Sequence, residues 1–167
     1  EASAIQLSKK YKDDDIACIK SYQLFTFDKG KNALNDKVVT VEEEAEMEFL
    51  SIKKFAGMVY PEYYNRFIQI RNFTKSAKYG TKYITIATRP IDRSVTDDGI
   101  FFDDSRVQYY PIRFTQRGAV NKISVKKQYS DSKYLTRLFF HEPYPVKEKV
   151  IEFKVPEWVT VDFKPMN

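Results

Sequence analysis

The sequence predicts an all-β protein, an antiparallel β-sandwich of about nine to ten short strands, and three observations support this fold class. Apolar and polar residues alternate with a period of two in many runs, as in strands that bury one face. Aromatic residues make up 16% of the 167 residues, and they favour strands and fill the layer between two sheets. No amphipathic helix longer than three turns is indicated, and strands without intervening helices form antiparallel sheets.

The predicted elements begin after a polar N-terminal segment, residues 1–15, which we expect to be mobile. A first strand starts at Ile16. The second covers residues 39–51, where the apolar residues share one parity and Glu42, Glu44, Glu46 and Glu48 share the other. Glu, Ala and Met also favour helices, but a helix would scatter these Glu residues around its circumference. Glu43 is the one exception to the alternation.

Further alternating runs predict strands near residues 64–71, 82–88, 106–115, 120–129, 134–140, 146–155 and 159–163. Helix is limited to at most a short helix near 51–65, the best place for a helix or an irregular crossover. No repeat and no Gly/Ser-rich or Pro-rich linker divides residues 16–167. We therefore expect a single β-sandwich domain over 16–167, excised from a longer protein.

Cysteine and histidine counts limit the chemistry that this chain can perform. It has one Cys and one His, so no internal disulfide and no Cys/His zinc site can form. Any Cys-His or Ser-His-Asp site would need His141. The longest nearly unbroken apolar run, residues 55–60, is too short to cross a membrane. We expect no metal, no cofactor and no transmembrane segment.

Four carboxylates gather in residues 97–104, the densest polar cluster of the chain. Calcium prefers such oxygen ligands, but the spacing does not match a calcium-binding loop. We instead expect a structural turn, in which Asp103 or Asp104 caps backbone N–H groups and pairs with Arg106. A weak hydrolase that uses Asp103, Asp104 or His141 stays an alternative, because sequence neighbours cannot establish a carboxylate separation.

Basic residues concentrate in residues 66–93, within a chain whose net charge is +5. Interleaved bases and aromatics can bind a polyanion. Alternating strands would produce the same composition, and no RNA-recognition motif, zinc finger or helix-turn-helix pattern accompanies the bases. Nucleic acid is therefore not an expected partner. A polyanion- or glycan-binding module remains an alternative, with its polyanion patch formed by Arg66, Arg71, Lys75, Lys78 and Lys82.

The order of several short motifs resembles a known family. They are Ile-Phe-Phe-Asp-Asp-Ser-Arg-Val at 100–107, Gly118, Tyr-Pro-Val at 144–146 and Val-Pro-Glu-Trp at 155–158. This series is similar to the uncharacterised N-terminal domain that precedes transglutaminase-like domains in secreted bacterial proteins, over roughly residues 16–167. The resemblance implies a β-rich domain without assigned activity, because the Cys-His-Asp site lies in the following domain. Cys18 and His141 then have no catalytic role.

From this resemblance we expect a noncatalytic accessory or interaction domain of an exported bacterial transglutaminase-like protein, periplasmic or at the cell surface. Its expected partner is a neighbouring domain of the same polypeptide, or a protein or glycan. Tyr144 and Trp158 are the candidate interface residues. Proline beside each marks a bend or strand boundary, and Trp is enriched at interfaces, although burial of Trp158 in the domain's own core is the alternative.

Overall fold

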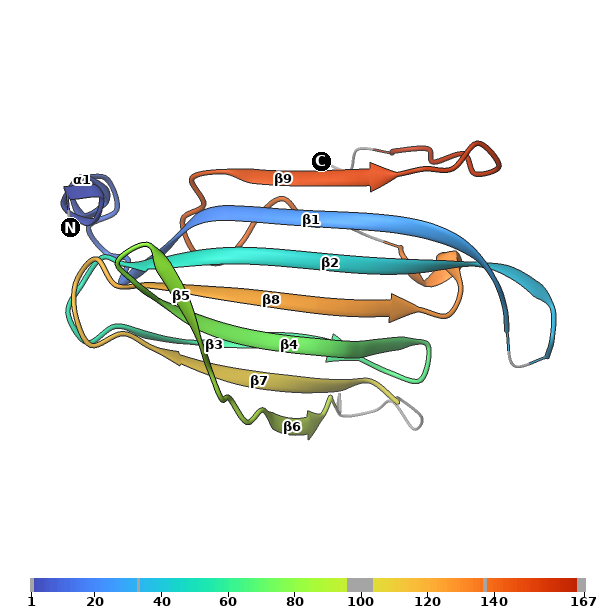
Figure 1. The fold of residues 1–167 in the computed structure, drawn as a ribbon, viewed down its shortest axis with the longest axis horizontal. Coiled ribbons are helices and arrows are strands. Elements are labelled where there is room, and N and C mark those ends of the chain that lie inside the picture. Colours follow the sequence, from blue (N-terminus) through green and yellow to red (C-terminus); the bar gives the residue numbers. More distant parts are fainter. Residues whose placement is uncertain (1, 33, 96–103, 137, 165–167) are drawn as a thin grey trace.

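The computed structural model describes residues 2–32, 34–95, 104–136 and 138–164, and these residues form two stacked β-sheets (Figure 1). The larger sheet has the strand order β5 (Lys82–Ile86), β4 (Ile68–Tyr79), β8 (Val120–Tyr129), β2 (Lys37–Ser51), β1 (Ile16–Lys31) and β9 (Lys149–Lys154). The smaller sheet has the order β3 (Gly57–Tyr64), β7 (Arg106–Arg113) and β6 (Ile91–Ser94). All neighbours are antiparallel except β1 and β9. The predicted all-β sandwich is confirmed.

Strand β2 forms as its alternation predicts, between β1 and β8. Its apolar parity is buried toward the small sheet, and its other parity carries the row of Glu side chains on the outer face of the large sheet. Two lysines of β8 meet this row: Lys122 lies 2.8 Å from Glu46, and Lys126 lies 2.8 Å from Glu42. Opposite charges on neighbouring strands thus neutralise the outer face.

The main core lies between the two sheets and explains why so many large apolar residues occur in this chain. Its buried members come from both sheets and include Ile16, Met47, Phe49, Ile112, Phe114, Ile123 and Val125. A second cluster fills the other end of the large sheet, around Phe25, Phe27, Val41 and Tyr129. No strand of the small sheet contributes to this second cluster; irregular residues near 134–138 and 159–161 cover it instead.

The helix is not where we expected it. Residues 51–65 contain strand β3, whose Pro61 would interrupt a helix, and the α-helix α1 (Ala2–Lys10) lies within the segment that we expected to be mobile. Figure 1 shows α1 beside the N-terminal end of β1. Ala4 and Leu7, one helical turn apart, pack there with Ala17 on the face of the large sheet that points away from the small one.

Two predicted strands do not form, and two strands, β3 and β6, were missed. The run 134–140 contains the end of the 3₁₀ helix η1 (Ser132–Tyr134) and irregular backbone, and 159–163 is also irregular. Val159 and Val161 do share one apolar contact surface, so their alternation reflects packing rather than a backbone ladder. Strand β6 has four exposed residues and therefore no alternation that could predict it.

Candidate functional site

A polar network crosses the core between the two sheets, where an ordinary sandwich is apolar. Two buried carboxylates organise it, Glu43 of β2 and Glu62 of β3. Glu43 accepts hydrogen bonds from the Tyr129 hydroxyl at 2.6 Å and from Gln23 Nε2 at 3.0 Å. Glu62 accepts from Lys127 Nζ at 3.0 Å and from the Tyr60 hydroxyl at 2.9 Å. We call these six residues the inter-sheet network.

The electrostatics of the inter-sheet network follow from burial. Burial raises the pKa of Glu62, although Lys127 opposes that shift. Burial disfavours the charge on Lys127, but Glu62 and Glu43 outweigh burial and raise its pKa. Burial also raises the pKa of Tyr60 and Tyr129, with the nearby carboxylates adding to the shift. Both tyrosines are therefore neutral donors, and two carboxylates share one buried ammonium group.

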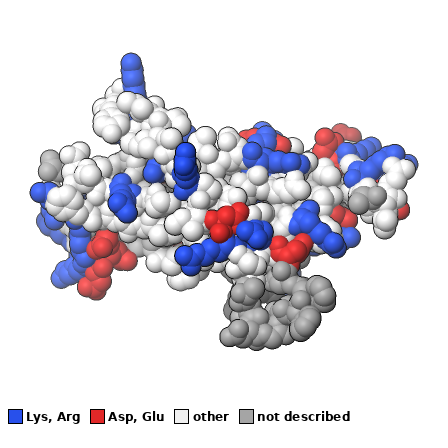
Figure 2. All heavy atoms as spheres, turned by 90° about the horizontal axis from the view of Figure 1, so that it is seen from below, with Lys and Arg blue, Asp and Glu red and all other residues white. Residues whose placement is uncertain are grey.

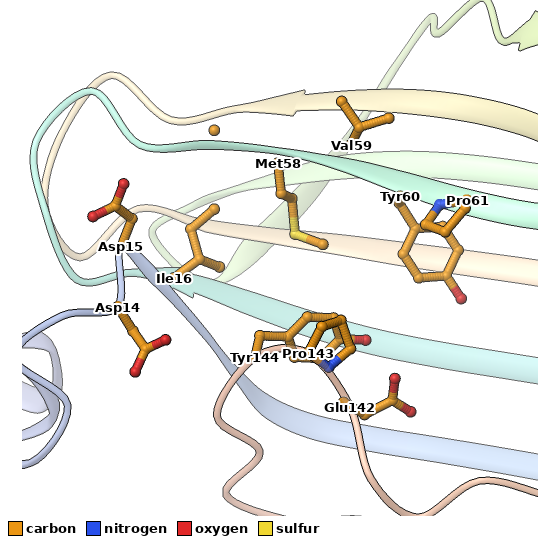
Figure 3. Close-up of a pocket in the computed structure, with 11 residues that line it drawn as sticks. Asp14, Asp15, Ile16, Met58, Val59, Tyr60, Pro61, Glu142, Pro143 and Tyr144 are labelled. Carbon is orange, nitrogen blue, oxygen red and sulfur yellow. The ribbon is translucent and has the colours of Figure 1, made fainter.

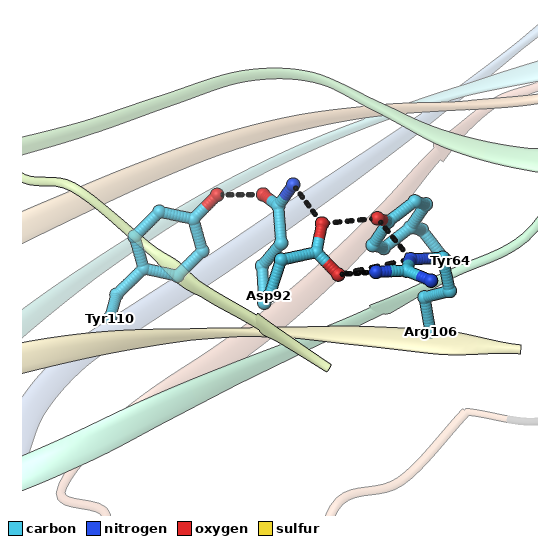
Figure 4. Close-up of polar contacts among 5 residues, drawn as sticks. Tyr64, Asp92, Arg106 and Tyr110 are labelled. Carbon is cyan, nitrogen blue, oxygen red and sulfur yellow. Dashed lines mark hydrogen bonds and ion pairs between the residues drawn. The ribbon is translucent and has the colours of Figure 1, made fainter. Parts of the chain in front are cut away.

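A second polar cluster lies on the small sheet, where β6 meets β7 (Figure 4). Arg106 Nη2 lies 2.8 Å from Asp92 Oδ1, and the Tyr64 hydroxyl donates to Asp92 Oδ2 at 2.5 Å. The hydrogen bond from Tyr64, followed by that from Arg106, lowers the pKa of Asp92. Gln108 links this ion pair to Tyr110. Its Nε2 donates a hydrogen bond to Asp92, and its Oε1 accepts one from the Tyr110 hydroxyl at 2.5 Å.

The predicted turn around residue 104 is described only in part, and Asp104 accepts a hydrogen bond from the backbone N–H of Arg66 at 3.4 Å. We expected Asp103 or Asp104 to pair with Arg106. Asp103 lies outside the described residues, and so do the other acids of that predicted cluster except Asp104. Asp104 lies 3.8 Å from Arg66, whereas the described partner of Arg106 is Asp92. Asp92 is 14 residues before Arg106, and no local sequence signal joins the two.

A cleft of about 390 Å³ opens beside β3 (Figure 3). Met58 and Tyr60 point from β3 toward Tyr144 across this cleft, and Val59 points away. Tyr144 packs edge-on against Phe49 at 5.2 Å, so this candidate interface residue belongs partly to the domain's own core. The lining also includes Gly57, Ile16, two prolines and the carboxylates of Asp14, Asp15 and Glu142. Through Tyr60, the cleft adjoins the inter-sheet network.

The five bases of the predicted polyanion patch do not share one face. Arg71 donates to Gln128 and Lys78 lies over the Tyr83 ring, on the outer face of the large sheet. Lys75 has the opposite parity and reaches the carbonyl of Pro111 in the small sheet, at 3.3 Å. Lys82 pairs with Tyr79, on the same parity as Lys75. Arg66 lies in the β3–β4 connection. On the face of the molecule that Figure 2 shows, bases and acids are interspersed.

Cys18 and His141 are not brought together. Burial raises the pKa of the Cys18 thiol to about 12, and Sγ donates to the carbonyl of Lys20. His141 is exposed. Within the described residues, no group of three His, Cys, Asp or Glu side chains could hold a metal ion. The described part of the chain also has no helix long and apolar enough to cross a bilayer.

Trp158 is 43% exposed and lies at the rim of a shallow hollow of about 800 Å³. Lys29 Nζ lies 5.0 Å from the centroid of its ring. Its neighbours along the chain are also unusually exposed for apolar residues. We use the name C-terminal surface for the exposed large apolar side chains of this segment, which share one stretch of chain rather than one proven face: Phe139, Phe140, Val150, Val155, Trp158 and Phe163. The interface role of Trp158 remains a prediction.

Apart from Tyr144 and Trp158, which were candidate interface residues, the inter-sheet network, the cleft and the C-terminal surface were not evident from the sequence. Glu43 alone gave a signal, since it interrupts the alternation of β2 with a charge at a buried position. The other members of the network come from three further strands, β1, β3 and β8, and no spacing rule connects them. The cleft is equally nonlocal, because its walls come from residues 14–16, 57–61 and 142–144.

Comparison with known proteins places the fold but not a family. No family model matches this chain, and no curated protein matches it. A solved structure described as a "putative protease" from Parabacteroides distasonis has a TM-score of 0.53 and 13% identity, and the match covers 86% of this chain. It covers only 29% of that protein, so this fold recurs there as one part of a much longer chain. At this identity the likeness concerns the fold alone.

A second solved structure is a "putative nutrient binding protein" from Legionella pneumophila. Its TM-score is 0.39 and its identity is 7%, over 69% of this chain and 40% of that protein. This chain therefore spans less than half the length of either protein. The fold is an all-β sandwich, and in the structure from Parabacteroides distasonis a similar fold forms one part of a longer chain.

Proposed function

We propose that this chain is a noncatalytic accessory domain of a larger protein, and that it packs against a neighbouring domain through the C-terminal surface. The observation that carries this proposal is the exposure of six large apolar side chains between residues 139 and 163. Phe139, Phe140 and Phe163 are 64–70% exposed. A contiguous exposed apolar patch marks a binding surface, and the proposal is that these side chains form such a patch.

The ionisable groups support a noncatalytic role. Those of the inter-sheet network are buried and already hydrogen-bonded to one another. A general acid or base must instead reach a bound substrate. His141 has no Cys18 beside it, and the Cys18 thiol is kept protonated by burial. The chain's charged side chains therefore serve structure and recognition in this proposal.

The identity of the neighbouring domain rests on the sequence resemblance. The motifs at 100–107, 144–146 and 155–158 resemble the domain that precedes transglutaminase-like domains in exported bacterial proteins. We propose a neighbour of that class, in the periplasm or at the cell surface. The fold's recurrence within a longer protein agrees with an accessory role.

Hydrogen exchange tests this proposal when this chain alone is compared with the same chain inside the complete gene product. We expect slower exchange over residues 139–163 in the complete protein, with β2 as an unchanged internal reference. Replacing Phe139 and Phe140 together by Ser should remove that protection. Tyr79→Ser is the matched control, because Tyr79 is 62% exposed at the far end of β4. Equal exchange in both contexts, or a gene product with no further domain, would contradict the proposal.

A further inference from the structure

We infer that the cleft beside β3 binds an extended segment of a partner polypeptide, which adds a strand to the small sheet and carries a Lys or Arg side chain. The backbone pattern of β3 is the first evidence. The N–H of Phe114 donates to the carbonyl of Ala56 at 2.8 Å, which sets the phase of the antiparallel β3–β7 ladder. Met58 and Tyr60 therefore exchange hydrogen bonds with β7.

The alternate residues of β3 direct their backbone groups away from β7. These residues are Gly57, Val59, Pro61 and Tyr63, and β3 is an edge strand. In the described part of the chain, no hydrogen bond reaches their backbone groups from outside the ladder. An unpaired strand edge is a template for another extended chain.

Pro61 restricts where such a chain can pair. Proline has no N–H, so the free edge is interrupted at its centre. The N–H groups of Gly57 and Val59 remain on one side of this interruption, and both residues line the cleft. Tyr63 lies on the other side, outside the cleft lining. The intact part of the edge and the cleft therefore coincide.

The cleft has room and a suitable surface for the added strand. Its opposite wall is the segment 142–144, which lies across the cleft from β3 (Figure 3). A paired strand would lie roughly 4.8 Å from β3. Because its side chains alternate between two faces, those pointing inward would contact Met58, Tyr60 and Tyr144. Apolar or β-branched residues suit these positions.

The charge of the cleft selects a cationic occupant. Three carboxylates line it, those of Asp14, Asp15 and Glu142, and among the described residues no Lys or Arg does. Asp15 pairs with Lys53 at 2.7 Å, and Glu142 pairs with Lys149 at 2.5 Å. Asp14 has no described ion-pair partner. A Lys or Arg of the added strand would meet Asp14 at the rim. This inference does not depend on the proposed function, because the cleft and the C-terminal surface are different.

Peptide binding to the 167-residue chain tests the inference. The probe is a fluorescently labelled nine-residue peptide in which Val and Lys alternate, and binding is followed by anisotropy. One comparison peptide has Glu in place of Lys. Another keeps the Val and Lys side chains but carries N-methyl groups on alternate amides, which removes the donors that would pair with β3. We expect each comparison peptide to bind at least tenfold more weakly than the probe.

Two pairs of variants locate the site. Val59→Pro removes an edge N–H inside the cleft and should weaken probe binding at least tenfold. Tyr63→Pro makes the same change at the same ladder phase but outside the cleft, and should leave affinity within about twofold. Asp14→Asn should weaken binding severalfold, whereas Asp13→Asn, at an exposed neighbour that does not line the cleft, should not. The Asp variants test the site even if a proline variant fails to fold.

Three outcomes would overturn the inference. They are no binding of the probe at millimolar concentration, equal binding of the N-methylated peptide, and equal effects of the two members of a variant pair. Analytical sedimentation tests whether a second copy of this chain occupies the edge of β3. A concentration-dependent dimer that Val59→Pro abolishes would assign the β3 edge to a second copy of this chain instead. Hydrogen exchange for the proposed function is read over 139–141 and 146–163, outside the cleft wall at 142–144, so either idea can fail alone.

Discussion

Lys127 is the residue on which the buried charges depend. Its side chain is only 14% exposed, and its ammonium group is hydrogen-bonded to Glu62 while Glu43 adds a second negative charge nearby. A buried ion pair contributes little net stability, but removal of one partner leaves an uncompensated charge in the core. The consequences of a substitution therefore depend on which charges remain.

Lys127→Met should lower the free energy of unfolding by about 3–5 kcal/mol, because it leaves two carboxylates unpaired in the core. The double variant Lys127→Met/Glu62→Gln should recover part of that loss. Urea unfolding measures both changes. Lys126→Met is the control, since Lys126 is bonded to Glu42 and Glu44 on the exposed outer face, and it should have a clearly smaller effect. Equal effects at Lys126 and Lys127 would contradict the buried network.

Glu62 should make stability depend on pH. Burial raises its pKa above the ordinary value of 4.5, so the folded protein binds a proton more readily than the unfolded chain. The contribution of Glu62 is therefore fully present below that value, and it is lost as pH rises through the higher folded-state pKa. The unfolding free energy is measured as a function of pH for the unmodified protein and for Glu62→Gln. The decline with rising pH that is due to Glu62 should be absent from the curve of the variant. An unchanged pH profile in the variant would show that another group titrates.

Single residues also show how far the sequence could be read. Glu43 visibly interrupts the alternation of β2, and its burial follows from that parity. Its contacts with Tyr129 and Gln23 do not follow, because hydrogen bonding across strands depends on sheet order and register. Asp92 had no signal at all: it lies in an exposed four-residue strand.

At the scale of elements, the sequence predicted best the strands that bury one face and expose the other. Side chains of β2, β7 and β8 point in turn toward the core and toward water, so the two-residue period of apolar residues is visible in the sequence. The failures have a common cause. The run 159–163 alternates because it packs on the second cluster without a strand partner, and α1 has so narrow an apolar side that its segment reads as polar.

Docking of α1 should depend on Ala4, which is fully buried against Ala17, Leu50 and Ile52. Ala4→Asp places a carboxylate in this apolar contact, which should destabilise the docked helix by about 1–3 kcal/mol. Limited proteolysis of residues 2–10 should accelerate accordingly. Gln6→Asp puts the same charge at an exposed position of the same helix, and it should leave the cleavage rate nearly unchanged. Equal cleavage of both variants would mean that α1 is not held by this contact.

For the whole molecule, the arrangement of charge predicts weak binding to polyanions. The bases of residues 66–82 are divided between the two faces of the large sheet and the β3–β4 connection, and acids lie among them. Binding to heparin should be feeble at about 0.15 M salt, because few bases can contact one polymer together. Reversing the charges of Arg71 and Lys78 should change it little. Tight binding that salt and this double reversal abolish would restore the polyanion interpretation.

The parallel pairing of β1 with β9 has a consequence for the newly made chain. Leu24 lies opposite Glu152, so the large sheet is completed only by residues that are translated 128 positions after their partners in β1. At about 5–20 residues per second, the edge of β1 waits several seconds or more after its own synthesis for its neighbour. During that time Phe25 and Phe27, which later stack with Phe153, lack this cover. On the ribosome, the nascent β1–β2 hairpin is therefore the segment most in need of a chaperone.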